Sequence, residues 1–92
     1  MQTADYLTTN ADGSVTVTLT KGLTLENATL MTITMREPTV GDQIAAQEIK
    51  GSIGAQEVAL IANLAEIAPQ DITRLNLRDY RRVQEALIGF SA

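Results

Sequence analysis

The side chains that could do chemistry in this chain are carboxylates and arginines, because its 92 residues include no histidine and no cysteine. These absences remove the commonest general base, thiol nucleophiles and the usual zinc ligands. Two pairs of acids are close in sequence, Glu37 with Asp42 and Asp79 with Glu85. Asp42 and Asp79 fit helix starts, and Glu85 follows Arg81 by four residues, so both pairs have ordinary structural explanations. We expect no enzyme activity, no cofactor and no metal site.

The arginines gather near the C-terminal end, at positions 74, 78, 81 and 82. Residues 74–92 hold these four arginines against two acids, a local charge of +2, whereas the whole chain carries −4. One interpretation is a solvated face balanced by acids on neighbouring helices, since surface ion pairs contribute little. The other is a basic strip in which Arg78, Arg81 and Arg82 bind an acidic partner or another copy of the chain.

A nucleic-acid-binding regulator that uses this arginine-rich end is a further alternative. The negative net charge and the 3% aromatic content disfavour it, because nucleic-acid binding needs a basic surface and gains from stacking rings. No apolar run approaches the length of a membrane span, and the polar first residues lack the pattern of a signal peptide. We expect a soluble, intracellular protein that does not bind membranes.

Alternating residues in the first half of the chain predict the strands that position these groups. Apolar residues alternate with threonines from Val15 to Thr20 and again from Thr29 to Arg36. The second run places its apolar side chains on one face: Met31, Ile33 and Met35. We predict a β-hairpin with a bulge at Gly22, which needs a cover because an isolated hairpin is marginally stable. Residues 1–13 are polar and without a period, so we predict a flexible N-terminal tail.

The second half of the chain has helical spacing and supplies that cover. Thr39 followed by Asp42 predicts a capped helix start, and Pro69 predicts a helix end. The predicted helical segments are residues 40–50, residues 55–67, a short turn over 69–75 and a last helix over 77–88. The predicted fold is therefore α+β, an N-terminal β-hairpin packed on three to four short α-helices in one domain over residues 1–92.

The segment 55–67 is apolar around more than half of its circumference, which is more than a surface helix needs. One interpretation is a central helix of the core. The other is a groove or stripe that binds a partner helix. In the second case the partner-binding residues would be Val58, Ile61, Leu64 and Ile67.

The stretch from Met35 to Asp42 reads MREPTVGD and joins the hairpin to the helices. Pro38 stops the strand, Thr39 caps the helix, Asp42 favours the positive helix end, and Gly41 would permit close packing. We therefore predict a structural joint. Its residues are Arg36, Glu37, Pro38, Thr39, Gly41 and Asp42.

Three motifs together resemble a known family. The hairpin ends in REPTVGD (residues 36–42), an alanine- and leucine-rich helix follows, residues 69–75 have the form P-x-D-I-x-x-L, and residues 77–90 have the form L-x-D-Y-x-x-V-Q-x-x-L-x-G-F. Over about residues 14–90 the chain resembles the tail assembly chaperones of Mu-like and related contractile-tailed phages. Met35 replaces the leucine that is more usual in that family.

The resemblance implies a non-enzymatic role in building a phage tail. It implies that the chain binds the long, helical, aggregation-prone tape measure protein, keeps it soluble and helps to recruit tail tube protein before leaving the finished particle. It also implies that the chain acts in the host cell cytoplasm and that a longer frameshifted form exists, of which this chain would be the short version. We further expect the chain to self-associate. The main alternative is a minor structural component that is retained in the virion.

Overall fold

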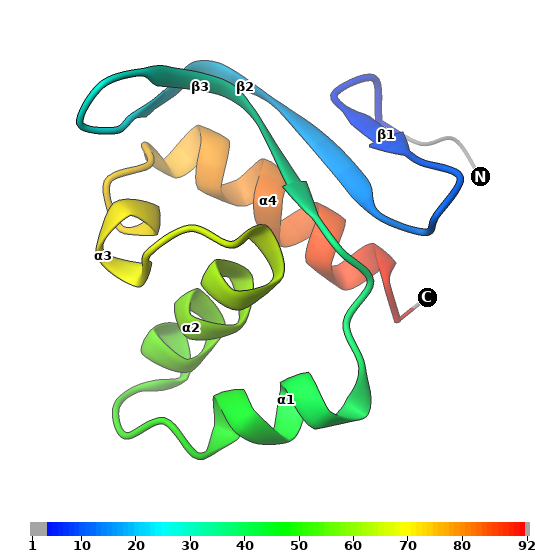
Figure 1. Cartoon of the computed structure of the whole chain (residues 1–92), viewed down its shortest axis with the longest axis vertical. Coiled ribbons are helices and arrows are strands. Elements are labelled where there is room, and N and C mark those ends of the chain that lie inside the picture. The colour runs from blue at the N-terminus through cyan, green and yellow to red at the C-terminus, as the bar shows by residue number, and fades with distance from the viewer. Residues whose placement is uncertain (1–3, 92) are drawn as a thin grey trace.

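A computed structural model describes residues 4–91 of the chain, which form a three-stranded antiparallel sheet followed by four helices (Figure 1). The strands are β1 (Leu7–Thr9), β2 (Val15–Thr24) and β3 (Thr29–Met35), in the spatial order β1-β2-β3. The helices are α1 (Val40–Gln47), α2 (Ile53–Ala65), α3 (Pro69–Ile72) and α4 (Leu77–Gly89). The predicted α+β class, with strands first and helices after, is confirmed.

The flexible tail predicted over residues 1–13 is wrong for the part that the structure describes, and residues 1–3 lie outside that part. Strand β1 pairs with the start of β2, with Leu7 opposite Val17 and Thr9 opposite Val15. The turn between the two strands closes through a hydrogen bond from the Asn10 N–H to the carbonyl oxygen of Ser14, at 2.8 Å. Three residues are too few to display a period, which is why the sequence pattern did not reveal this strand.

The alternation in β2 and β3 gives the sheet one apolar face and one threonine face. The apolar face is buried, with Val17, Ile33 and Met35 each at most 2% exposed. It packs against helix side chains that are equally buried, which supplies the cover that the hairpin requires. These helix residues are Ile61, Leu64, Ile72 and Val83.

The predicted bulge at Gly22 is confirmed and is large. The pair Thr18–Thr32 is followed by the pair Leu23–Leu30, so residues 19–22 of β2 lie opposite the single residue Met31 of β3. Gly22 has a φ of +85°, and a Cβ atom added there would lie 2.8 Å from the carbonyl oxygen of Leu30. Met31 lies over this glycine and is 49% exposed, so the prediction that Met31 faces the core with Ile33 and Met35 is wrong.

The bulge is fixed by Asp79 in the first turn of α4. The Asp79 carboxylate accepts hydrogen bonds from the Thr20 N–H at 2.7 Å, the Thr20 hydroxyl at 2.8 Å and the Lys21 N–H at 3.1 Å. Asp79 is completely buried. Although burial by itself raises the pKa of Asp79, these hydrogen bonds outweigh it and hold that pKa below its ordinary value. The aspartate that fits a helix start thus also ties that helix to the sheet.

The predicted helix boundaries need five corrections. Helix α3 ends at Ile72 rather than at residue 75, and α4 ends at Gly89 rather than at residue 88. Helix α1 ends at Gln47 rather than at residue 50. Helix α2 begins at Ile53 rather than at residue 55, because the Ser52 hydroxyl accepts a hydrogen bond from the Ala55 N–H at 3.1 Å and caps the helix. It ends at Ala65 rather than at residue 67, since Glu66 takes a left-handed conformation (φ 57°, ψ 45°).

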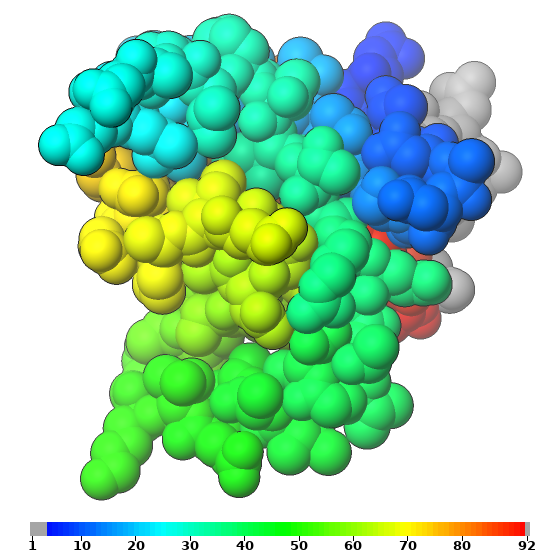
Figure 2. All heavy atoms as spheres, in the orientation of Figure 1, coloured from blue at the N-terminus to red at the C-terminus, as the bar shows by residue number. Residues whose placement is uncertain are grey.

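The helices form two parts of the molecule in Figure 1. Helix α4 runs along the sheet, whereas α1 and the first half of α2 lie at the end far from the strands. In Figure 2 this end is a lobe, coloured green, that projects away from the sheet. Among residues 4–91, no helix is long and apolar enough to cross a membrane.

Candidate partner-binding groove

The predicted joint is an ordered connection between β3 and the helices. The Arg36 guanidinium donates two hydrogen bonds to the Asp42 carboxylate, at 2.7 and 2.9 Å. Asp42 also completes the predicted capping box with Thr39, because each residue's side chain accepts a hydrogen bond from the other's backbone N–H. The hydrogen bonds from Arg36, followed by those from Thr39, hold the pKa of Asp42 far below its ordinary value.

The joint is also attached to the end of α2. The Arg36 N–H donates to the carbonyl oxygen of Leu64 at 3.1 Å, and the Asn63 side-chain amide donates to Asp42 at 3.3 Å. Gly41 does not provide close packing, which corrects our interpretation. A Cβ atom added there would meet only the Thr39 hydroxyl at 3.6 Å, an ordinary contact.

The remaining joint residues lie on the surface of this connection. Glu37 is exposed, and its carboxylate lies against Gly13 of the β1–β2 turn. Pro38 is partly buried and faces the groove described below.

The four residues predicted to bind a partner through α2 differ in how deeply they are buried. Ile61 and Leu64 are 0% and 2% exposed, so they pack in the core and offer nothing to a partner in this fold. Val58 and Ile67 are partly buried and pack against the same core. The partner-binding role predicted for Ile61 and Leu64 therefore conflicts with their burial. Their positions fit the other interpretation of this segment, a central helix.

The arginines near the C-terminal end also differ, in the contacts that their guanidinium groups make. Arg82 donates to the carbonyl oxygen of Thr18 at 2.8 Å, and its guanidinium lies 4.1 Å from the centre of the Tyr6 ring. Arg74 approaches Asp71 at 3.5 Å. Arg78 and Arg81 are exposed and form no ion pair with the residues that the structure describes. Only these two arginines are placed as the predicted basic strip requires.

An open apolar groove lies between α1, the first half of α2 and the end of α4, with a volume of about 350 Å³. We call it the α1–α2–α4 groove. Its apolar walls are formed by Pro38, Ala46, Ile53, Leu60, Leu87 and Ile88. Ile53 and Ile88 are 85% and 70% exposed, so their side chains stand largely in solvent at the groove. Large exposed apolar side chains that gather in this way are typical of interaction sites.

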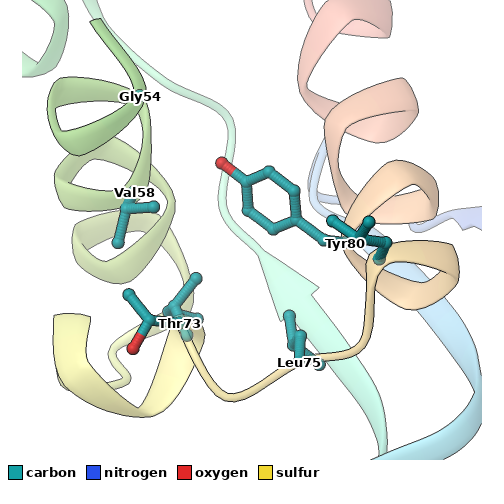
Figure 3. A pocket seen from close by; sticks show the side chains of 7 residues that line it. Gly54, Val58, Thr73, Leu75 and Tyr80 are labelled. Carbon is teal, nitrogen blue, oxygen red and sulfur yellow. The ribbon is translucent and has the colours of Figure 1, made fainter. Parts of the chain in front are cut away.

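A second hollow of about 280 Å³ lies between α2, α3 and the start of α4 (Figure 3). We call it the α2–α3–α4 pocket. It is lined by Val58, Thr73, Leu75 and Tyr80, among others, and Leu77 beside it is 73% exposed. Figure 3 shows the Tyr80 side chain projecting from α4 toward α2 across this space.

Glu57 lines the α1–α2–α4 groove and is hydrogen-bonded to Tyr80, which lines the α2–α3–α4 pocket. One oxygen of its carboxylate accepts hydrogen bonds from the Tyr80 hydroxyl at 2.5 Å and from the Gln84 side-chain amide at 2.8 Å. Burial of Tyr80 and its hydrogen bond to Glu57 together raise the pKa of Tyr80 above its ordinary value. Both donors are neutral, and within residues 4–91 no arginine or lysine pairs with Glu57. The groove therefore contains a carboxylate whose charge is not neutralised by the described chain.

This groove is not predicted by the sequence pattern. The predicted helix over residues 55–67 leaves Ile53 outside it, and Ile88 is only the last residue of the predicted helix over 77–88. The available signal was Ser52, a residue suited to capping, directly before an isoleucine. Capping by Ser52 brings Ile53 into the first turn of α2, where it reaches the groove. Among the residues that the structure describes, no group of three acids could hold a metal ion.

Residues 16–91 match the model of a family described as "Phage tail assembly chaperone proteins, E, or 41 or 14". No curated protein and no solved structure matches the chain.

Proposed function

Since the chain belongs to the phage tail assembly chaperone family, we propose that it binds the tape measure protein of its phage, keeps that protein soluble and promotes assembly of the tail tube. The family membership implies an interaction with tail proteins. The tape measure protein is the tail component whose expected properties, a long helical chain prone to aggregation, most require a chaperone.

The α1–α2–α4 groove is the observation that carries this proposal. A chaperone must cover apolar surface on its client, and this groove presents Ile53 and Ile88 in solvent beside half-buried Leu60 and Leu87. Amphipathic helices bind in such grooves through a few apolar side chains spaced three or four residues apart. A volume of about 350 Å³ accepts a few side chains rather than a whole helix.

So small a site implies weak binding by each copy. Several copies along one long partner would bind it by avidity, without high affinity at any single position. Weak individual contacts would also let the chaperone leave when tail tube protein covers the same partner. We propose accordingly that the chain self-associates, acts without catalysis in the host cell cytoplasm and is absent from the finished virion. A longer frameshifted form of the chain would be a further partner.

Co-expression with the tape measure protein encoded in the same genome tests the proposal. We expect the soluble fraction of the tape measure protein to rise several-fold and a tagged chain to co-purify with it. The proposal is wrong if the tape measure protein is equally soluble with and without the chain and does not co-purify. Mass spectrometry of purified particles decides between an assembly factor and a structural component, because a structural component would remain in them.

A further inference from the structure

We infer that the α1–α2–α4 groove receives an amphipathic helix that carries a lysine or arginine, and that this cation pairs with Glu57. The inference rests on the proposed function, since it specifies the chemistry of the tape measure segment that would bind. It also assigns Glu57 as the residue that selects among apolar helices.

The hydrogen bonds of Glu57 are the first reason. Tyr80 and Gln84 both donate to the same carboxylate oxygen, Oε1, and fix the side chain in place. Neither donor carries a charge. A helix that covered the groove would remove water from this carboxylate, and removing an unpaired charge from water is costly. A partner that brings its own cation avoids that cost.

The surrounding charge is the second reason. Residues 36–66, which include α1 and α2, hold five acids against Arg36 and Lys50, a net charge of −3. This part of the surface attracts a basic segment and repels an acidic one. At the groove itself the other polar side chains are neutral: Gln43, Gln47, Gln56 and Ser91. Glu57 is therefore the charged residue in the groove wall that can choose between partners.

The groove has the rigidity that such recognition needs. The Gln56 side-chain amide donates to the carbonyl oxygen of Gln47 at 3.3 Å and to that of Ile49 at 3.1 Å. These two bonds hold the segment between α1 and α2 against the first turns of α2. Ile53 and Glu57 are four residues apart on α2, so they lie on the same side of the helix. A bound helix could therefore place an apolar residue on Ile53 and a cation on Glu57 one turn apart.

Overlapping 30-residue peptides that span the tape measure protein of the same genome provide the test. Binding of each peptide to the full chain is measured by fluorescence anisotropy at two salt concentrations. We expect the bound peptides to be amphipathic helices with lysine or arginine beside the apolar face, and we expect binding to weaken as salt rises. Acidic peptides of equal apolarity should not bind.

Two pairs of variants make the test specific. Glu57→Gln keeps an acceptor for Tyr80 and Gln84 but removes the charge, and we expect it to weaken binding by about tenfold. Glu26→Gln, in the β2–β3 turn, changes the net charge equally and should have no effect. Ile53→Asp should abolish binding, whereas Val40→Asp, at another exposed apolar position on the same lobe, should not.

The outcomes separate this inference from the proposed function. If the tape measure protein binds the wild-type chain and all four variants equally, the proposed function stands and the groove assignment is wrong. If Ile53→Asp abolishes binding but Glu57→Gln does not weaken it, the pairing of a cation with Glu57 is wrong. If Ile53→Asp instead dissociates copies of the chain in sedimentation experiments without affecting peptide binding, the groove holds a second copy and the inference is overturned. If the tape measure protein does not bind the wild-type chain, the proposed function itself fails.

Discussion

Asp79 and Thr20 join the first turn of α4 to the bulge of β2, across 59 positions of sequence, through hydrogen bonds of 2.7 and 2.8 Å. A bulge leaves strand N–H groups without partners in the neighbouring strand. Here the buried carboxylate of Asp79 accepts hydrogen bonds from two of them, those of Thr20 and Lys21. The irregularity in the sheet is therefore the attachment point of the last helix.

Replacing Asp79 by alanine should lower the free energy of unfolding by about 2 kcal/mol, because the N–H groups of Thr20 and Lys21 and the Thr20 hydroxyl would lose their buried acceptor. Urea denaturation of the purified chain measures this. Asp71→Ala is the matched control. Asp71 also lies in the first turn of a helix, but it is partly exposed and its one ion pair, with Arg74, is 3.5 Å long. A loss for Asp79→Ala no larger than for Asp71→Ala would contradict the proposed attachment.

Stability should depend on pH through Asp42 and Asp79, whose pKa values are both lowered in the folded chain. An aspartate with a lowered folded pKa stabilises the fold at pH values above its unfolded pKa, and that contribution is lost as the pH falls through the folded pKa. We therefore expect the unfolding temperature to be constant between about pH 5 and about pH 8 and to fall below roughly pH 4. Asp42→Asn should reduce the size of that fall. A melting temperature that stays constant from about pH 5 down to about pH 2 would contradict the assignment of this pH dependence to Asp42 and Asp79.

The fold class and the joint could be predicted from the sequence because both depend on local signals. The alternation from Val15 to Met35 and the Thr39–Asp42 capping box act over a few residues. The attachment of Asp79 to the bulge could not be predicted, since it depends on residues far apart in the chain. The same limit left two interpretations open for α2. The share of a helix circumference that is apolar does not show whether a residue such as Ile61 faces the core or a partner.

The groove was missed for a related reason. Its lining residues come from α1, α2 and α4, so the pattern of any single segment does not reveal it. The burial of Ile61 and the exposure of Ile53 become clear only when the three helices are placed together.

Gly22→Ala should lower the free energy of unfolding by about 1–3 kcal/mol, since alanine is strained at a positive φ. The added Cβ would also lie only 2.8 Å from the carbonyl oxygen of Leu30. Gly89→Ala is the control, because a Cβ there would meet no atom within 4 Å. Thermal unfolding of both variants should show a clear loss for the first and none for the second. Equal stability of the two would show that the bulge tolerates a side chain.

Thr39→Ala should lower the free energy of unfolding by about 1 kcal/mol, because it removes the acceptor of the capping box at the start of α1. The Arg36–Asp42 pair would persist in this variant. Circular dichroism during thermal unfolding measures the change. Ser52→Ala, which removes the cap of α2, provides a comparison of similar size. No loss in either variant would mean that packing alone fixes both helix starts.

Arg82→Ala should release β1 from the rest of the sheet while leaving β2 and β3 intact. Arg82 contacts the Tyr6 ring and donates to the carbonyl oxygen of Thr18, and the Thr18 N–H donates in turn to the carbonyl oxygen of Tyr6 at 2.8 Å. Loss of the guanidinium should therefore speed hydrogen exchange at the Thr18 amide. The Ile33 amide, which lies between β2 and β3, should be unaffected.

Arg81→Ala removes an equal charge from an exposed position and should change neither amide. Equal exchange at Thr18 in the two variants would mean that strand pairing and the hydrogen bond from the Tyr6 hydroxyl to Glu85 retain β1 without Arg82. Arg82 would then be free to bind a partner, as the sequence analysis proposed.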